Sequence, residues 1–186
     1  MVVTESPTGD AAGVTSVADQ VRELFTEHDA EVAVHAGEWG THLVMDIPGA
    51  GSQRDAAPVL FIGHSDTVWP TGTLETMPFR IEEGTAYGPG IFDMKSGLLI
   101  MHQGLSVSTE LGLSRPPVRV IVVGDEEIGS PSSKELLLAS AEGVSAVLGF
   151  ESPHPGGALK VGRLGSTRLR LQVTGRASHA ALDPEG

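Results

Sequence analysis

The chain has no cysteine, and aromatic side chains make up only 4% of its 186 residues. Without cysteine there are no disulfides, thiol nucleophiles or cysteine-ligated zinc sites, so any bound metal must be held by histidine and carboxylates. Basic residues are also few, because 12 lysines and arginines stand against 24 acidic residues, giving a formal net charge of −12. That charge argues against sequence-independent binding to phosphates. We therefore expect neither nucleic acid nor a membrane as a partner.

Long apolar runs are missing as well. No stretch approaches the roughly 18 residues of a membrane span, and residues 1–10 have neither a basic nor an apolar signal region. We therefore expect a cytoplasmic protein. Hydrophobic residues make up 40% of the 186 positions, which is enough for one globular domain and part of another.

The hydrophobic pattern predicts alternating helices and strands. Apolar residues at helical spacing predict a helix over 14–28, and two strands, 31–34 and 42–47, follow around a glycine turn. Short and almost wholly apolar runs then alternate with predicted helices, which is typical of an α/β fold with a mostly parallel sheet flanked by helices. The runs are 59–62, 118–123 and 146–150; the helices span 94–110 and begin at Ser132, where Ser132 and Glu135 have capping-box spacing.

The last predicted strand differs from the others. Residues 166–174 alternate apolar with polar side chains, and this period of two indicates a half-exposed strand in another sheet. We place a domain boundary near residues 162–165. Residues 1–163 then form one domain, and residues 164–186 begin a second.

Each of the three apolar runs ends in polar residues that a buried strand has no structural reason to carry. They are His64 and Asp66 after the first run, Asp125–Glu127 after the second and Glu151 after the third. Ligands of open α/β sheets bind at the carboxyl ends of the strands. Asp93 follows a glycine-rich loop and precedes a predicted helix, so we expect it at the same edge. Four segments that are distant in sequence therefore converge.

These side chains suit a metal site. A metal-bound imidazole is oriented by an acceptor on its second nitrogen, a role that Asp66 can fill for His64. The adjacent carboxylates of Glu126 and Glu127 repel each other at the end of an apolar strand, and a divalent cation removes that cost. One of them then binds metal while its neighbour shuttles protons. Each residue alone has a structural alternative, as a strand end, a turn or a helix cap, and the joint pattern with Asp93 is what favours metal.

Five motifs, in order along the chain, resemble those of the M20 metallopeptidase family. They are FIGHSDTV, GPGIFDMKSG, GDEEIGS, ESP and GRASHAALDPEG, and ESPTGD near the start is similar to the family's first segment. The resemblance is closest to the glutamate carboxypeptidase branch, with acetylornithine deacetylase, succinyl-diaminopimelate desuccinylase and aminoacylase as relatives. It implies the N-terminal part of a zinc-peptidase-like catalytic domain over residues 1–163 and the beginning of an α+β dimerisation (lid) domain over residues 164–186.

The resemblance implies a two-zinc site that hydrolyses an amide bond, with cobalt as the alternative metal. His64 and Glu151 would bind one zinc, and Glu127 would bind the other. Asp93 would bridge both ions and be followed by a cis peptide bond. Glu126 would be the general base that takes a proton from the attacking water and returns it to the leaving amine.

The resemblance also implies a role for the second domain. His179 matches the histidine that the family's dimerisation domain contributes to the neighbouring subunit, where it helps to stabilise the oxyanion. The full-length protein would be a homodimer that acts on a small peptide or N-acyl amino acid and releases a carboxylate-bearing amino acid. The other histidines we assign to packing or to the surface: His28, His35, His42, His102 and His154.

Some features depart from the family pattern. The family's last zinc-binding histidine lies near its carboxyl terminus, and the 186 residues contain no counterpart. The alternative hypothesis is therefore a truncated or degenerate, non-catalytic member that binds metal weakly. Gly124, Phe92 and Ser96 also differ from the usual residues at their positions, and none of them is a proposed ligand.

Overall fold

A computed structural model describes residues 1–182 except 163, 166, 168, 173, 176–178 and 180. The chain divides into two compact units, Met1–Ser152 and Pro153–Gly186. The second unit contains the short 3-10 helix η5 (Pro155–Gly157). The predicted strand over 166–174 includes residues outside the described ones, so this strand and the domain boundary near 162–165 stay predictions.

A mixed β-sheet forms the centre of the first unit. Within the described residues its strand order is β1-β2-β6-β3-β7. The strands are β1 (Glu31–Gly37), β2 (Gly40–Ile47), β3 (Val59–His64), β6 (Val118–Val123) and β7 (Ala146–Gly149). β3 is parallel to β6 and β7, whereas β2 is antiparallel to β1 and β6. The predicted α/β fold is confirmed, and the antiparallel ribbon of β1 and β2 joins the parallel strands at β6.

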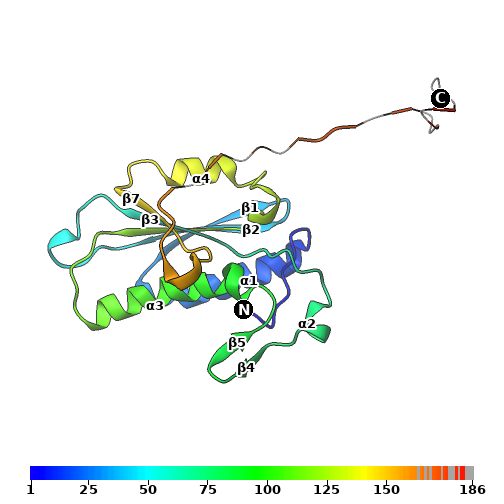
Figure 1. Cartoon of the computed structure of the whole chain (residues 1–186). Coiled ribbons are helices and arrows are strands. Elements are labelled where there is room, and N and C mark those ends of the chain that lie inside the picture. Colours follow the sequence, from blue (N-terminus) through cyan, green and yellow to red (C-terminus); the bar gives the residue numbers. More distant parts are fainter. Residues whose placement is uncertain are drawn as a thin grey trace. The chain divides into compact units, whose positions relative to one another are not determined.

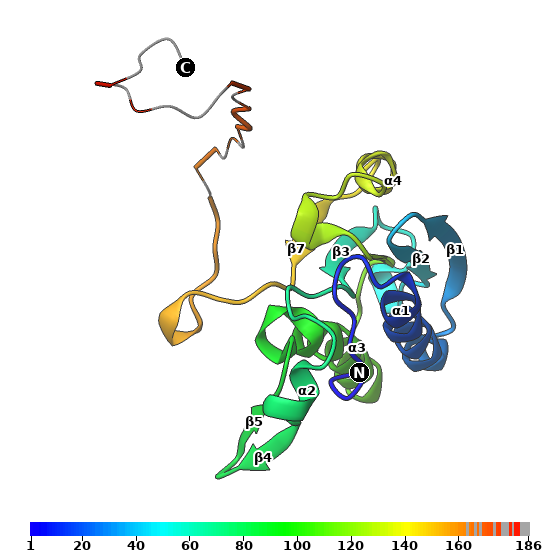
Figure 2. The ribbon, with the colours of Figure 1, turned by 90° about the vertical axis from the view of Figure 1, so that its right-hand side faces the viewer.

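Helices cover both faces of this sheet. α1 (Ala11–Phe25) and α3 (Ser96–Glu110) lie on one face, and α4 (Lys134–Ser140) lies on the other (Figures 1 and 2). The helix predicted over 14–28 is α1 followed by the 3-10 helix η1 (Thr26–His28). In the part of the chain that the structure describes, every helix is too short or too polar to cross a bilayer.

The two faces bury cores of different size. The larger core lies between α1, α3 and the sheet and includes Phe25, Leu43 and Leu98, all fully buried. The smaller core joins Leu60, Ile121 and Val123 to leucines of α4. Burial of apolar surface in the larger core is the main stabilising contribution to the unit.

Two glycines let these layers approach closely. A side chain at Gly63 on β3 would come within 3.0 Å of atoms of Met94, Met101 and Leu98. A Cβ at Gly124, directly after β6, would lie 2.6 Å from a methyl group of Val14 on α1. The departure from the family pattern at Gly124 thus has a packing reason.

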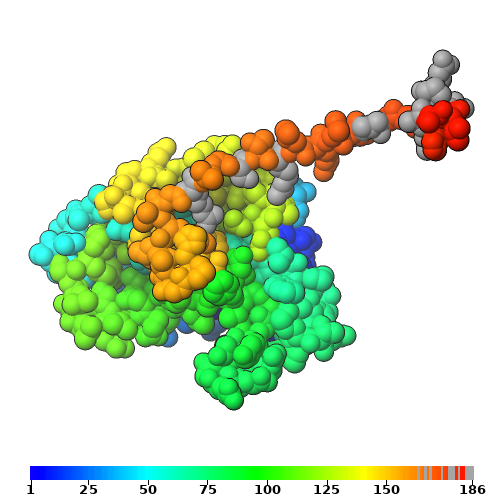
Figure 3. All heavy atoms as spheres, in the orientation of Figure 1, coloured from blue at the N-terminus to red at the C-terminus, as the bar shows by residue number. Residues whose placement is uncertain are grey.

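A small hairpin was not predicted from the sequence. It consists of β4 (Arg80–Glu82) and β5 (Thr85–Tyr87), follows the short helix α2 (Thr73–Thr76), and protrudes from the surface of the unit (Figure 3). The guanidinium of Arg80 lies 4.4 Å from the centre of the Tyr87 ring. All residues of the two strands are exposed, so no apolar period marks them.

The expectation that all three apolar runs are covered on both faces is wrong for β7. All its residues are exposed, and Val147 and Leu148 keep 50% and 47% of their surface accessible. The reason is position, because β7 is the edge strand and pairs with β3 alone among the described strands.

The predicted capping box is also wrong. α4 begins at Lys134, and the side chain of its N-cap residue Ser133 makes no hydrogen bond to the helix backbone. The hydroxyl groups of Ser132 and Ser133 instead donate to the buried carboxylate of Asp125. Asp125 also accepts the backbone N–H of Ser132 at 2.7 Å, which is the donor that the side chain of Glu135 would accept in a capping box.

Candidate metal centre

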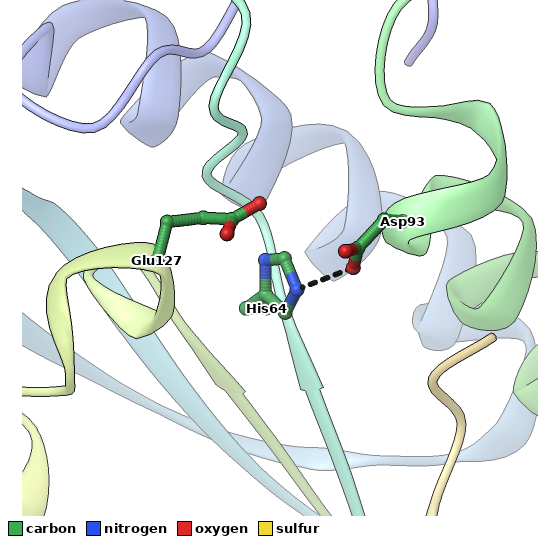
Figure 4. A group of neighbouring side chains, drawn as sticks. All are labelled: His64, Asp93 and Glu127. Carbon is green, nitrogen blue, oxygen red and sulfur yellow. Dashed lines mark hydrogen bonds and ion pairs between the residues drawn. The ribbon is translucent and has the colours of Figure 1, made fainter. Parts of the chain in front are cut away.

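Three potential ligands meet at the carboxyl edge of the sheet. His64 is the last residue of β3, and Glu127 lies in the 3-10 helix η4 (Glu126–Ile128) that follows β6. Asp93 lies in η3 (Ile91–Lys95), directly before α3. One ligand atom from each of these three residues lies within 4.8 Å of the other two. Figure 4 shows Glu127 and Asp93 extending towards the imidazole from opposite sides.

Two further carboxylates approach the same imidazole. Nε2 of His64 is 3.2 Å from Oδ1 of Asp93, 3.5 Å from Oε1 of Glu151 and 4.0 Å from Oε2 of Glu126. The His64 side chain is 1% exposed, whereas those of Asp93 and Glu126 are 55% and 48% exposed. A buried base is thus surrounded by carboxylates that reach solvent. The peptide bond from Asp93 to Met94 is cis, as the family resemblance implies.

Asp66 contacts the other side of the imidazole. Nδ1 of His64 lies 2.9 Å from the backbone oxygen of Asp66 and 3.3 Å from its carboxylate. The same carboxylate, which is fully buried, accepts the backbone N–H groups of Glu126 and Glu127, each at 3.2 Å. Asp66 therefore links β3 to η4. Sequence reasoning identified the carboxylate as the orienting group and missed the backbone oxygen.

Thr8 makes a second contact to Asp66 that was not predicted from the sequence. Its hydroxyl donates to Oδ2 of Asp66 at 2.6 Å, across 58 positions of sequence. The only signal for it was the similarity of ESPTGD to the family's first segment, which named no role for Thr8.

His64, Asp93, Glu126, Glu127 and Glu151 form one cluster, and burial and crowding raise the pKa of three of its carboxylates. Burial raises the pKa of Glu127 to about 7, against the opposing effect of His64 and with help from Asp93 and Glu126. Burial likewise raises the pKa of Glu126 and, together with Glu151, that of Asp93. These three carboxylates thus hold protons more tightly than free ones do.

The imidazole shows the opposite balance. Burial lowers the pKa of His64, but its contacts with Asp66 and Glu151 outweigh burial and raise this pKa to about 11. A proton on His64 therefore offsets part of the negative charge around it when no metal is bound. Metal binding requires a neutral imidazole, so a cation must displace this proton.

The cluster fits a divalent cation. In the described part of the chain, Oε1 of Glu127 is buried and has no hydrogen-bond partner, although a carboxylate oxygen without a donor is costly to bury. A cation between His64, Asp93 and Glu127 would satisfy that oxygen and remove the repulsion among the carboxylates. Imidazole and carboxylate donors without cysteine are a set that zinc accepts.

Among the described residues, His64 is the histidine that groups with Asp93 and Glu127 as a potential ligand. His179 belongs to the second unit, is exposed, and accepts the N–H of Ala181 on Nδ1 at 3.2 Å, so its predicted role stays a prediction. His28 and His42 are buried, His102 is half-buried, and His35 and His154 are exposed. These positions agree with the assignment of the five residues to packing or to the surface.

Comparison with known sequences identifies the family. The profile of peptidase family M20/M25/M40 matches residues 60–180, a segment that contains all the residues of this cluster. The chain belongs to this family.

Relatives within the M20 group include two curated enzymes. Carboxypeptidase G2 of Pseudomonas sp. (strain RS-16) is 33% identical over 187 residues, covering 100% of this chain and 45% of the relative. Succinyl-diaminopimelate desuccinylase of Ruegeria pomeroyi is 34% identical over 146 residues, covering 70% of this chain and 37% of the relative. The chain therefore spans less than half the length of these two relatives.

A solved M20 structure shares the fold. An M20 family metallo-carboxypeptidase from Sulfolobus solfataricus superposes with a TM-score of 0.67 at 15% identity, covering 84% of this chain and 37% of that one. A likeness at this level of identity bears on the fold alone. It confirms the catalytic-domain architecture expected from the M20 resemblance.

Proposed function

We propose that this chain carries the larger part of a two-zinc site for amide-bond hydrolysis. The observation that carries the proposal is the approach of His64, Asp93 and Glu127 to within 4.8 Å of one another. His64 and Glu151 would hold one ion, with Glu127 at the other and Asp93 between them; cobalt is the alternative metal. The bound ions would make water more acidic and polarise the amide carbonyl.

The residues of the chain would carry the proton transfers. We assign Glu126 as the general base. Its half-exposed carboxylate lies 4.0 Å from Nε2 of His64, farther than the carboxylates of Asp93 and Glu151. It would take a proton from the attacking water and deliver it to the leaving amine. A raised pKa, caused by burial, suits a carboxylate that must first accept and then donate a proton. Asp66 would keep the imidazole of His64 oriented.

The substrate we propose is a small peptide or N-acyl amino acid that releases a carboxylate-bearing amino acid. Two relatives support this class by name, one a carboxypeptidase and the other a desuccinylase. In the full-length protein, which we propose to be a homodimer, His179 would assist the active site of the neighbouring subunit by stabilising the oxyanion.

Replacing Glu126 with Gln tests the assignment. We expect the wild-type protein to bind zinc or cobalt stoichiometrically and to hydrolyse an N-acyl-glutamate or a dipeptide. Glu126→Gln should lower kcat by about 10²–10⁴-fold, because the base is lost, while metal content by elemental analysis stays unchanged. Glu135→Gln, the same change on an exposed residue of α4, should leave both unaltered.

Two results would contradict the proposal. A wild-type protein without stoichiometric zinc or cobalt would contradict the metal site and favour the degenerate alternative. Full turnover in Glu126→Gln would contradict the role of Glu126 alone.

A further inference from the structure

The segment before α1, residues Met1–Thr8, lies against the loop that carries Asp66. The N–H of Thr67 donates to the backbone oxygen of Ser6 at 2.8 Å, and the N–H of Thr8 donates to the backbone oxygen of Thr67 at 3.1 Å. These bonds form a parallel bridge between Pro7 and Thr67. The bridge holds the Thr8 side chain next to the Asp66 carboxylate.

Thr8 makes the shortest hydrogen bond that the structure records for this carboxylate. The hydroxyl lies 2.6 Å from Oδ2 of Asp66, whereas the N–H groups of Glu126 and Glu127 are both 3.2 Å away. Hydrogen bonds to ionised groups are the stronger ones, and a buried carboxylate that loses a donor keeps the full cost of its burial. Removal of the hydroxyl would leave Oδ2 with the N–H of Glu127 as its remaining recorded donor.

Two further contacts anchor the segment on either side. The carboxylate of Glu5 accepts the N–H groups of Gly72 and Leu74, each at 2.8 Å. The ammonium group of Lys95, a residue that is 2% exposed, donates to the backbone oxygen of Thr4 at 2.8 Å and to that of Met1 at 3.3 Å. Lys95 is two residues beyond Asp93. The segment Met1–Thr8 therefore contacts both the loop that carries Asp66 and the turn that carries Asp93.

We propose that Thr8 is a positioning residue of the metal centre. Its hydroxyl fixes the Asp66 carboxylate and, through Asp66, sets the imidazole of His64 and the backbone of Glu126 and Glu127. The role rests on the proposed function, because a positioned ligand matters only where a metal binds. The contacts themselves involve groups of the chain alone, so they can also be tested without added metal.

A conservative series separates positioning from ordinary packing. Thr8→Val keeps the shape of the side chain and removes the hydroxyl, whereas Thr8→Ser keeps the hydroxyl. Thr15→Val is the matched control, since Thr15 is also half-buried and its hydroxyl contacts that of Thr41 at 3.2 Å. Each variant is titrated with Co²⁺ and followed by its visible absorption, and its thermal unfolding is measured without metal.

We expect Thr8→Val to weaken Co²⁺ binding by about tenfold or more, as for other groups that orient metal ligands. Thr8→Ser should bind within about threefold of wild type, and Thr15→Val should bind like wild type even if its unfolding temperature falls. Thr8→Val with wild-type affinity would overturn the proposal. So would a loss of affinity in Thr15→Val equal to that in Thr8→Val, because the effect would then follow general stability.

A second measurement applies without metal. The Nδ1–H of His64 faces the backbone oxygen of Asp66, so it should exchange slowly with solvent in NMR spectra recorded without metal. Exchange should become faster in Thr8→Val and remain slow in Thr8→Ser. If the wild-type protein binds no Co²⁺, the proposed function is contradicted. If the Nδ1–H of His64 exchanges as slowly in Thr8→Val as in wild type, the positioning role of Thr8 is contradicted, whatever the result with metal.

Discussion

The larger core and the carboxylate cluster lie on the same sheet and differ in almost every physical respect. The core between α1, α3 and the sheet contains thirteen buried residues, all of them apolar. At the carboxyl edge, a buried imidazole lies within 4.0 Å of four carboxylates. Apolar burial stabilises the folded chain, whereas crowded like charges destabilise it. The core therefore offsets the cost of a site whose arrangement serves binding.

Met94 connects the two regions. Its side chain is fully buried in the larger core, and its sulfur accepts the backbone N–H of His64 at 3.2 Å. Its backbone follows Asp93 directly. A residue that packs in the core thus contacts one proposed ligand and neighbours another, so loosening the core would disturb the site.

The largest effect on stability should come from the core. Phe25→Ala removes a fully buried ring that also contacts the rings of His28 and His102 edge-on. We expect a loss of about 3–5 kcal/mol in the free energy of unfolding, measured with urea, because the change leaves a cavity. Phe79→Ala, at a ring that is 42% exposed, is the control and should cost far less. Equal losses in the two variants would mean that the core is not the stabilising region.

The next largest effect on the free energy of unfolding should come from zinc binding, which relieves the repulsion among the carboxylates of the cluster. Zinc at roughly 100 times its Kd should raise the free energy of unfolding by about 2.7 kcal/mol, because only the folded chain presents the ligands together. Glu127→Gln should lose most of this gain, whereas Glu135→Gln should keep it. Thermal unfolding with and without zinc measures both. Equal stabilisation of the two variants would show that zinc binds elsewhere.

The sequence was sufficient to predict the features that have a local pattern. The strands preceding His64 and Glu127 are almost wholly apolar, so their ends and the convergence of polar residues there could be foreseen. Residues 80–87 have no such pattern, because the strands of this hairpin are three residues long and exposed on both faces. Periodicity reports burial, and it fails where nothing is buried.

Contacts between distant segments were beyond sequence reasoning. The hydrogen bond from Thr8 to Asp66 spans 58 positions, and that from Gly124 to His42 spans 82. The capping box failed for a more local reason, because Asp125, seven residues before Ser132, accepts the donors of Ser132 in a turn that spacing alone does not reveal. The structure brings the predicted ligands together, but the hydroxyl of Thr8 and the backbone oxygen of Asp66 could not be identified as orienting groups from the sequence.

The smallest effect lies beside the larger core, at a close pair of histidines whose rings contact Phe25. Nε2 of His28 is 2.9 Å from Nδ1 of His102, and burial followed by the charge of His102 lowers the pKa of His28 from its ordinary value of 6.5. The folded chain then binds a proton at His28 less readily than the unfolded chain does. This residue's contribution is therefore fully present above about pH 6.5 and is lost as the pH falls below it. Stability from urea unfolding should decline less steeply from pH 7 to pH 5 in His28→Gln than in wild type, and His35→Gln, at an exposed position, should follow wild type. An unchanged slope in His28→Gln would assign the acid sensitivity to other groups and contradict the role of this histidine pair.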